Sequence, residues 1–340
     1  MTYEKQSKIF RRFAEVECKD SSPLYEYLSL KIAKDDWLLE LSSHAHMGQP
    51  VPNLLYGAVH YLLLKGKNHT LKQFYPSITG DEEAPEDSFP HFKRFCKSYE
   101  TEIISILKTK NVQTNEVRRC AYLYPVFCYV FRKTKKPLSF IEIGTSAGLQ
   151  LLWDRFSYSY GNEKIYGSKD ARLHIQTQVK NGTLTLIDKI PPVKARVGVD
   201  LHICDLRNEE DYLWLKALIW PEHTERFAIF EQAVKEYKKN PPKLVEGDGV
   251  KLLPSLAEQI PENHTLCIFH THVANQLPKE VKEELLEEIN KIGRNRNVYH
   301  IYNNIWDGKL HLDYFMDGTF YENTIGETDA HGRWFEWNLV

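Results

Sequence analysis

A turn between an apolar run and a helix-like segment carries the residues best suited to ligand chemistry. Its sequence, FIEIGTSAGLQ, places Gly144, Ser146 and Gly148 at alternate positions, and Glu142 stands two residues before Gly144. Glycine lets a ligand approach the backbone closely, or lets a helix begin against a strand. A carboxylate at a strand end can attract a cationic group. Such a turn could bind a phosphate, bind a nucleoside or only allow close packing. The residues that follow it in the sequence help to distinguish these three possibilities.

The residues after the turn argue against two common nucleotide motifs. A P-loop needs Lys followed by Ser or Thr after its last glycine, but Leu149 and Gln150 stand there. A dinucleotide fingerprint needs glycines spaced G-x-G-x-x-G, which this turn does not match. An NAD(P)-dependent oxidoreductase is therefore the disfavoured alternative.

Two further acids follow later predicted strands. Asp200 ends the strand in RVGVDL, and Asp248 follows the strand in VEGDGVKLLP. Because the carboxyl ends of parallel strands meet at one sheet edge, we expect both acids to lie near the glycine turn. Each acid alone could equally be a helix cap or a turn residue. Asp205 competes with Asp200 for its role.

Two histidines lie at the end of a fourth predicted strand, in FHTH. Alternation along a strand would point His270 and His272 to one face, where they could orient or deprotonate a substrate. Packing is an equally good explanation, and H-x-H could also be half of a metal site. No carboxylate lies at metal-ligand spacing, so we expect no metal. His60, in an apolar helix, is expected to be a core residue.

The pattern of apolar residues predicts two domains. Residues 1–135 show helical periodicity and helix-capping residues, which predict an all-helical N-terminal domain. Residues 136–340 alternate short apolar runs with helices, which is typical of a mostly parallel α/β sheet, here with an antiparallel last strand. Asn181 and Gly182 predict a type I′ turn in a hairpin insertion at about 171–188.

Composition limits the function classes. The chain has 340 residues, 42% of them apolar and 26% charged, with a net charge of −2, so we expect no nucleic-acid partner. No apolar stretch is long enough to cross a bilayer, and the N-terminus lacks the apolar core of a signal peptide. Six cysteines without a C-x-x-C pair indicate reduced thiols. We therefore expect a cytoplasmic protein with no membrane partner.

The glycine turn and the ordered acids resemble class I S-adenosylmethionine-dependent methyltransferases, with Ser146 where the middle glycine usually stands. The resemblance implies a Rossmann-like sheet and S-adenosylmethionine as cofactor. It also implies that Asp200 binds the ribose hydroxyls and Asp248 the adenine amino group. The N/D-P-P-Y/F motif of enzymes that methylate base amines is absent. We expect a small-molecule methyl acceptor.

The whole chain, including GQPVPNLLYGAVHYLL and the HGRWFEW ending, resembles an uncharacterised bacterial family, domain of unknown function 2332. That resemblance implies a helical N-terminal part joined to a methyltransferase-like C-terminal part, and it brings no substrate. A non-enzymatic protein that binds a nucleoside, a metabolite or a partner on the same fold stays an alternative, because fold alone does not decide function.

Overall fold

The chain forms two compact units. The computed structural model describes residues 3–81, 83–113, 115–187 and 189–339. One unit comprises residues 1–114 and 207–228, and the other comprises 115–206 and 229–340. The first unit is helical and the second contains the sheet, so the predicted fold class is confirmed. Whether 1–135 and 136–340 are separate domains stays a prediction, because compactness does not show which segments fold alone.

The helical unit is built from short helices. Its α-helices are α1 (Glu4–Arg12), α2 (Pro23–Ile32), α3 (Asp36–Ser42), α4 (Val51–Leu64), α5 (Pro76–Thr79), α6 (Ser88–Ser98), α7 (Glu100–Thr109), α9 (Glu209–Ala217) and the start of α10 (Thr224–Lys239). Single-turn elements join them: the π-helix η1 (Phe13–Cys18) and the 3₁₀-helices η2 (Thr70–Phe74) and η3 (Pro85–Asp87).

Helix α4 is the buried centre of this unit. Eleven of its residues are buried, including His60. The two ring nitrogens of His60 contact the Ala217 carbonyl at 3.0 Å and the Ser77 hydroxyl at 2.9 Å. Burial lowers the pKa of His60 to about 3. The prediction of a core histidine with its hydrogen bonds satisfied is confirmed.

The second unit is organised around an eight-stranded sheet. Its strands run in the order β11-β10-β9-β8-β1-β6-β7, with β12 paired to β10. They are β1 (Leu138–Ile143), β6 (Val193–Asp200), β7 (Lys243–Glu246), β8 (Thr265–His270), β9 (Val298–Tyr302), β10 (Leu310–Met316), β11 (Thr319–Tyr321) and β12 (Thr324–Gly326). The five strands β7, β6, β1, β8 and β9 are parallel, and β10 is antiparallel to β9.

This strand order makes the sheet Rossmann-like. From β1 the chain first builds outward through β6 and β7, and then returns to place β8 and β9 on the other side of β1. The order therefore reverses between β1 and β8. Open α/β sheets bind ligands outside the carboxyl ends of the strands at such a switch point.

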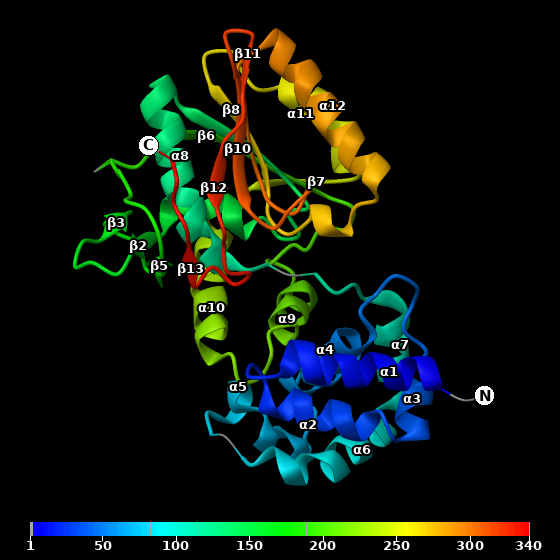
Figure 1. The fold of residues 1–340 in the computed structure, drawn as a ribbon. Helices are drawn as coiled ribbons and strands as arrows, with labels where there is room; N and C mark the ends of the chain where they lie inside the picture. The colour runs from blue at the N-terminus through cyan, green and yellow to red at the C-terminus, as the bar shows by residue number, and fades with distance from the viewer. Residues whose placement is uncertain (1–2, 82, 114, 188, 340) are drawn as a thin grey trace. The chain divides into compact units, whose positions relative to one another are not determined.

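Helices cover both faces of the sheet (Figure 1). Helices α11 (Gly249–Glu258) and α12 (Lys279–Asn295) pack their aliphatic residues on one face, together with Ile141 and Ile268 of the central strands. Helix α8 (Cys120–Thr134) packs on the other face, where its Phe127 contacts the rings of Phe140 and Phe269. The central strands, buried on both faces, are fully enclosed, as expected of a parallel sheet.

The segment after the glycine turn differs from its prediction. The predicted helix is the short 3₁₀-helix η5 (Leu149–Arg155), and it leads into a small sheet in the order β3-β2-β4. These strands are β2 (Ser157–Ser159), β3 (Tyr166–Gly167) and β4 (His174–Gln176). Residues 149–153 are all buried, so the segment lacks the exposed face of an amphipathic helix.

The predicted hairpin at 171–188 does not form in its described part, which excludes residue 188. Strand β5 (Gln178–Val179) pairs in parallel with β13 (Trp334–Phe335) near the end of the chain. Gly182 has a φ of +88°, but Asn181 does not have the positive φ that a type I′ turn requires. A Cβ on Gly182 would lie 1.7 Å from the Trp337 carbonyl oxygen. Gly182 therefore serves close approach of the chain end.

No described helix is long and apolar enough to cross a membrane. All six cysteines are buried and outside any disulfide bond.

Replacing Gly198 of β6 tests the packing beneath the glycine turn. A Cβ there would lie 2.4 Å from the Thr145 hydroxyl oxygen, so Gly198→Ala should lower the free energy of unfolding by about 1–3 kcal/mol through overpacking. Gly308→Ala is the control, because nothing lies within 4 Å of its Cβ position. Urea unfolding measures both variants, and a Gly198→Ala protein as stable as the control would contradict the packing.

Candidate functional site at the carboxyl edge of the sheet

The glycine turn crosses the end of the neighbouring strand. Gly144, Ser146 and Gly148 have φ values of +69°, +52° and +73°, in the left-handed region. Glycine adopts this conformation freely, whereas it is strained for serine. The backbone N–H groups of Gly144 and Thr145 both donate to the Val199 carbonyl, at 2.8 and 3.2 Å. The turn is therefore fixed to β6.

The Asp200 carboxylate at the end of β6 bonds directly to the glycine turn. Its Oδ2 accepts a hydrogen bond of 2.7 Å from the Ser146 N–H, and its Oδ1 accepts one of 3.1 Å from the His202 N–H. The competitor, Asp205, accepts a hydrogen bond of 3.3 Å from Tyr237. The structure thus joins Asp200, the predicted acid of the second strand, to the predicted glycine turn.

The glycines of the turn make room for side chains. A Cβ on Gly144 would lie 2.4 Å from a methyl group of Val273, in the loop after β8. A Cβ on Gly148 would lie 2.9 Å from both Leu244 and Pro242. Gly148 thus lets η5 begin against β7, while Val273 occupies the space beside Gly144 that was predicted for a ligand.

Glu142 is buried below the turn. Its carboxyl group accepts a hydrogen bond of 2.6 Å from the Thr145 hydroxyl. Burial raises the pKa of Glu142 to about 8, and the nearby charge of Asp200 adds to this rise. Glu142 is therefore mostly protonated at pH 7. Attraction of a cationic group, the role predicted for it, requires the loss of that proton.

Asp248 follows β7 and caps the N-terminus of α11. Its Oδ1 accepts hydrogen bonds from the N–H groups of Val250 and Lys251, at 3.0 and 3.3 Å. Its Oδ2 lies 3.5 Å from the Lys251 ammonium, and 43% of the side chain is exposed. Capping uses one carboxylate oxygen, so the other remains accessible.

His270 and His272 contact different groups, so the prediction of one shared face is wrong. Strand β8 ends at His270, and His272 has a φ of +55°, which breaks the alternation of a strand. The Nε2 atom of His270 lies 3.2 Å from Nε2 of His300 on β9. His272 contacts the next loop: its N–H donates to the Asn303 side chain at 2.7 Å, and its Nδ1 lies 3.3 Å from Asn304.

Both histidines are neutral. Burial lowers the pKa of each to about 3, and the positive charge of Arg119 also contributes at His272. A neutral imidazole can accept a hydrogen bond or a proton. His270 shares its Nε2 with His300 while its Nδ1 has no partner among the described residues, and Nε2 of His272 likewise has none.

Three of the buried polar side-chain atoms without partners lie in the loops after adjacent strands. They are Ser146 Oγ after β1, His272 Nε2 after β8 and Asn303 Nδ2 after β9, and none has a partner in the described parts of the chain. Each such atom costs about 1–3 kcal/mol if it stays unpaired. Because these three atoms follow neighbouring strands at the switch point, this edge is a candidate ligand site.

The site contains residues that the sequence analysis did not select. Thr271 exchanges hydrogen bonds of 3.0 Å with Gln150, and Arg119 donates to the Thr271 carbonyl at 3.3 Å. The Glu116 carboxylate lies 3.2 Å from the His331 ring. Thr271 and Asn303 could have been found, because they follow neighbouring strand ends in FHTH and HIYNN. Arg119 and Glu116 come before the first strand of the sheet, and no local sequence motif identifies them as residues of the site.

Comparison with known protein families identifies the family of this chain. A family model described as "Uncharacterized protein conserved in bacteria (DUF2332)" matches residues 7–337. The chain belongs to the DUF2332 family. No curated protein and no solved structure matches it. In the described part of this DUF2332 protein, no group of three or more His, Cys, Asp or Glu side chains is placed to hold a metal ion.

Glu142 gives the DUF2332 protein a measurable pH dependence. The folded protein keeps the Glu142 proton up to a pH of about 8, whereas the unfolded chain releases it near 4.5. The folded state thus binds more protons between these values, and its stability falls as the pH rises through this window. Glu142→Gln removes this loss, so its stability relative to the wild type should rise by up to about 4 kcal/mol from pH 5 to pH 9. Denaturant unfolding measures both proteins, and parallel pH profiles would contradict a buried, protonated Glu142.

Proposed function

We propose that this protein is an S-adenosylmethionine-dependent methyltransferase that acts on a small-molecule acceptor. One observation carries the proposal. Three adjacent parallel strands, β1, β6 and β7, each have an acid at the carboxyl end, and the glycine turn after the first is bonded to the acid of the second. These acids are Glu142, Asp200 and Asp248. Their order supports a nucleoside site.

The remaining hydrogen-bonding capacity of the site fits such a ligand. Each Asp200 oxygen accepts one backbone N–H and has a second lone pair for a ribose hydroxyl. Asp248 has an accessible oxygen for the adenine amino group. The unpartnered Ser146 hydroxyl supplies a further polar contact. Because Val273 fills the space beside Gly144, the amino acid end of the cofactor must displace Val273 or lie outside it.

The acceptor lies on the side of β8 and β9 in this proposal. S-adenosylmethionine supplies an activated methyl group, and the protein contributes mainly by holding the two reactants in line. Each histidine has one ring nitrogen without a partner in the described chain, but His270 is fully buried whereas His272 is only partly buried, so His272 is better placed to contact the acceptor. Its low pKa keeps it a hydrogen-bond acceptor at neutral pH.

The first test is ligand-dependent stability. S-adenosylhomocysteine should bind the full chain and raise its free energy of unfolding by roughly 2.7 kcal/mol at a hundredfold excess over its dissociation constant. Calorimetry and thermal unfolding measure the two quantities, with NADH as the comparison ligand. Absence of binding at millimolar S-adenosylhomocysteine would sink the proposal. Binding of NADH in its place would favour the oxidoreductase alternative.

The second test separates a ligand contact at Asp248 from its capping role. Asn caps helices nearly as well as Asp, so Asp248→Asn should leave stability almost unchanged. Loss of a charged acceptor for the adenine amino group should weaken S-adenosylhomocysteine about ten- to hundredfold.

Asp35→Asn is the matched control, because Asp35 caps α3 in the helical unit in the same way. It should not change the affinity. If calorimetry gives Asp248→Asn the wild-type affinity, Asp248 is a helix cap alone and has no place in the site.

A further inference from the structure

A second candidate site lies between α12 and the antiparallel part of the sheet. The cavity there has a volume of about 420 Å³, within the range of small-molecule sites. Five aromatic side chains of the sheet and the following loops line it: Tyr302, Trp306, Tyr314, Phe315 and Phe320. Two of them, Trp306 and Phe320, are 60% and 50% exposed. Large exposed aromatic side chains in a hollow are typical of a binding surface.

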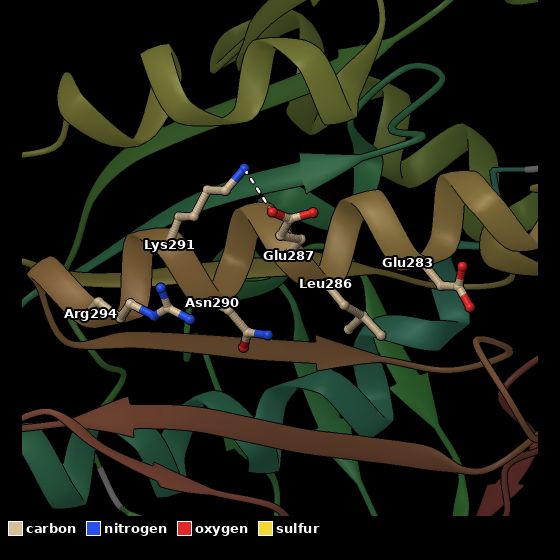
Figure 2. A pocket seen from close by; sticks show the side chains of 6 residues that line it. All are labelled: Glu283, Leu286, Glu287, Asn290, Lys291 and Arg294. Carbon is tan, nitrogen blue, oxygen red and sulfur yellow. Dashed lines mark ion pairs between the residues drawn. The ribbon is translucent and has the colours of Figure 1, made fainter.

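Helix α12 forms the opposite wall. In Figure 2, Leu286, Asn290 and Arg294 extend from α12 toward the neighbouring strands, and all three also line this cavity. Lys291 and Glu287 lie on another side of the helix and pair with each other at 3.2 Å. The helix therefore turns a mainly uncharged surface, with one arginine, toward the sheet.

A buried carboxylate lies in the cavity wall. Asp313 of β10 is 7% exposed, and it accepts hydrogen bonds from the Tyr302 hydroxyl at 2.7 Å and from the Asn323 N–H at 3.3 Å. A carboxylate can accept about four hydrogen bonds, so half of its capacity is left. No lysine or arginine among the described residues forms an ion pair with Asp313.

An unpaired buried carboxylate is costly, and a cation beside it would offset that cost. Aromatic faces also attract cations, most strongly when water is excluded. The exposed carboxylate of Glu322, at the same cavity, adds negative charge. Carboxylates and aromatic rings together thus define the chemistry of the missing partner.

We propose that this cavity binds a small organic ammonium ion with an apolar body. The ammonium group bonds to Asp313, and the body packs among Trp306, Phe315 and Phe320.

Two cations lie near the site: Arg294 lines the cavity, and the Lys282 ammonium lies 5.8 Å from the centre of the Trp306 ring. Arg294 is exposed, so water screens its repulsion of a bound cation. The argument for this cavity does not rest on the nucleoside site proposed above, although His300 in the cavity lining lies 3.2 Å from His270.

The probes for this site share one shape and differ in charge. Titration calorimetry on the full chain uses 2-phenylethylamine, the neutral 2-phenylethanol and the anionic 3-phenylpropanoate. The amine should bind at least tenfold more tightly than the alcohol, and the acid should bind weakest. No binding of the amine at millimolar concentration, or equal binding of amine and alcohol, would overturn the proposal. So would a preference for the acid, which would assign the charge recognition to Arg294.

The variants identify the groups that bind. Asp313→Asn keeps the shape of the side chain and should weaken the amine about ten- to hundredfold, while the alcohol keeps its affinity. Trp306→Ala, at an exposed position where folding is not at risk, removes apolar surface that packs on the body of the amine and should weaken the amine about three- to thirtyfold. Glu287→Gln removes an acid from α12 outside the cavity and should change nothing.

Circular dichroism establishes that each variant is folded. If Asp313→Asn does not fold, Trp306→Ala and Glu322→Gln decide the matter, because both positions are exposed. Wild-type amine affinity in Asp313→Asn, or in both exposed variants, would contradict the site.

Discussion

The hydrogen bond between the Ser146 N–H and the Asp200 carboxylate holds the candidate site together. It joins the turn after β1 to the end of β6 at 2.7 Å, across the boundary between the two central strands. The turn can accept this position because Gly144 and Gly148 adopt left-handed conformations and because Gly198 leaves room for Thr145 beneath it. A carboxylate bonded to backbone N–H groups is also fixed in orientation, which is what recognition of a ribose demands. One acid thus shapes the turn and prepares the proposed contact.

The loops after β8 and β9, on the other side of β1, contain buried polar atoms that lack hydrogen-bond partners among the described residues. After β8 and β9, His272 and Asn303 are tied to each other through one hydrogen bond of 2.7 Å, yet each keeps a buried polar atom without a partner in the described chain. His272 also has a left-handed conformation, which is costly for any residue but glycine. Backbone strain of this kind clusters at functional sites, and unpartnered buried polar atoms call for an explanation such as a bound ligand. The strand-end acids after β1, β6 and β7 and the unpartnered atoms after β8 and β9 thus lie on two sides of the sheet edge, which we propose to be the nucleoside side and the acceptor side.

The sequence predicted those parts of the fold that depend on local pattern. Continuous apolar runs predicted the parallel strands, because strands buried on both faces contain few polar residues. The position of Asp200 at the sheet edge followed from its place at the end of one of these runs. The hairpin at Asn181 failed because β5 pairs with β13, more than 150 residues away, and long-range pairing overrode a good turn sequence. The prediction that His270 and His272 share one face of a strand was wrong because β8 ends at His270, before His272. Arg119 and Glu116 could not be found, since they reach the edge from a segment before β1.

The most direct measurement of the central claim is a crystal structure of the full chain grown with S-adenosylhomocysteine. The account predicts that the ribose lies against Asp200 and the adenine amino group against Asp248, with the amino acid end beside the Gly144 turn and Val273 moved or bypassed. Ligand found instead in the cavity between α12 and β10, or adenine turned away from Asp248 while Asp248 only caps α11, would contradict it.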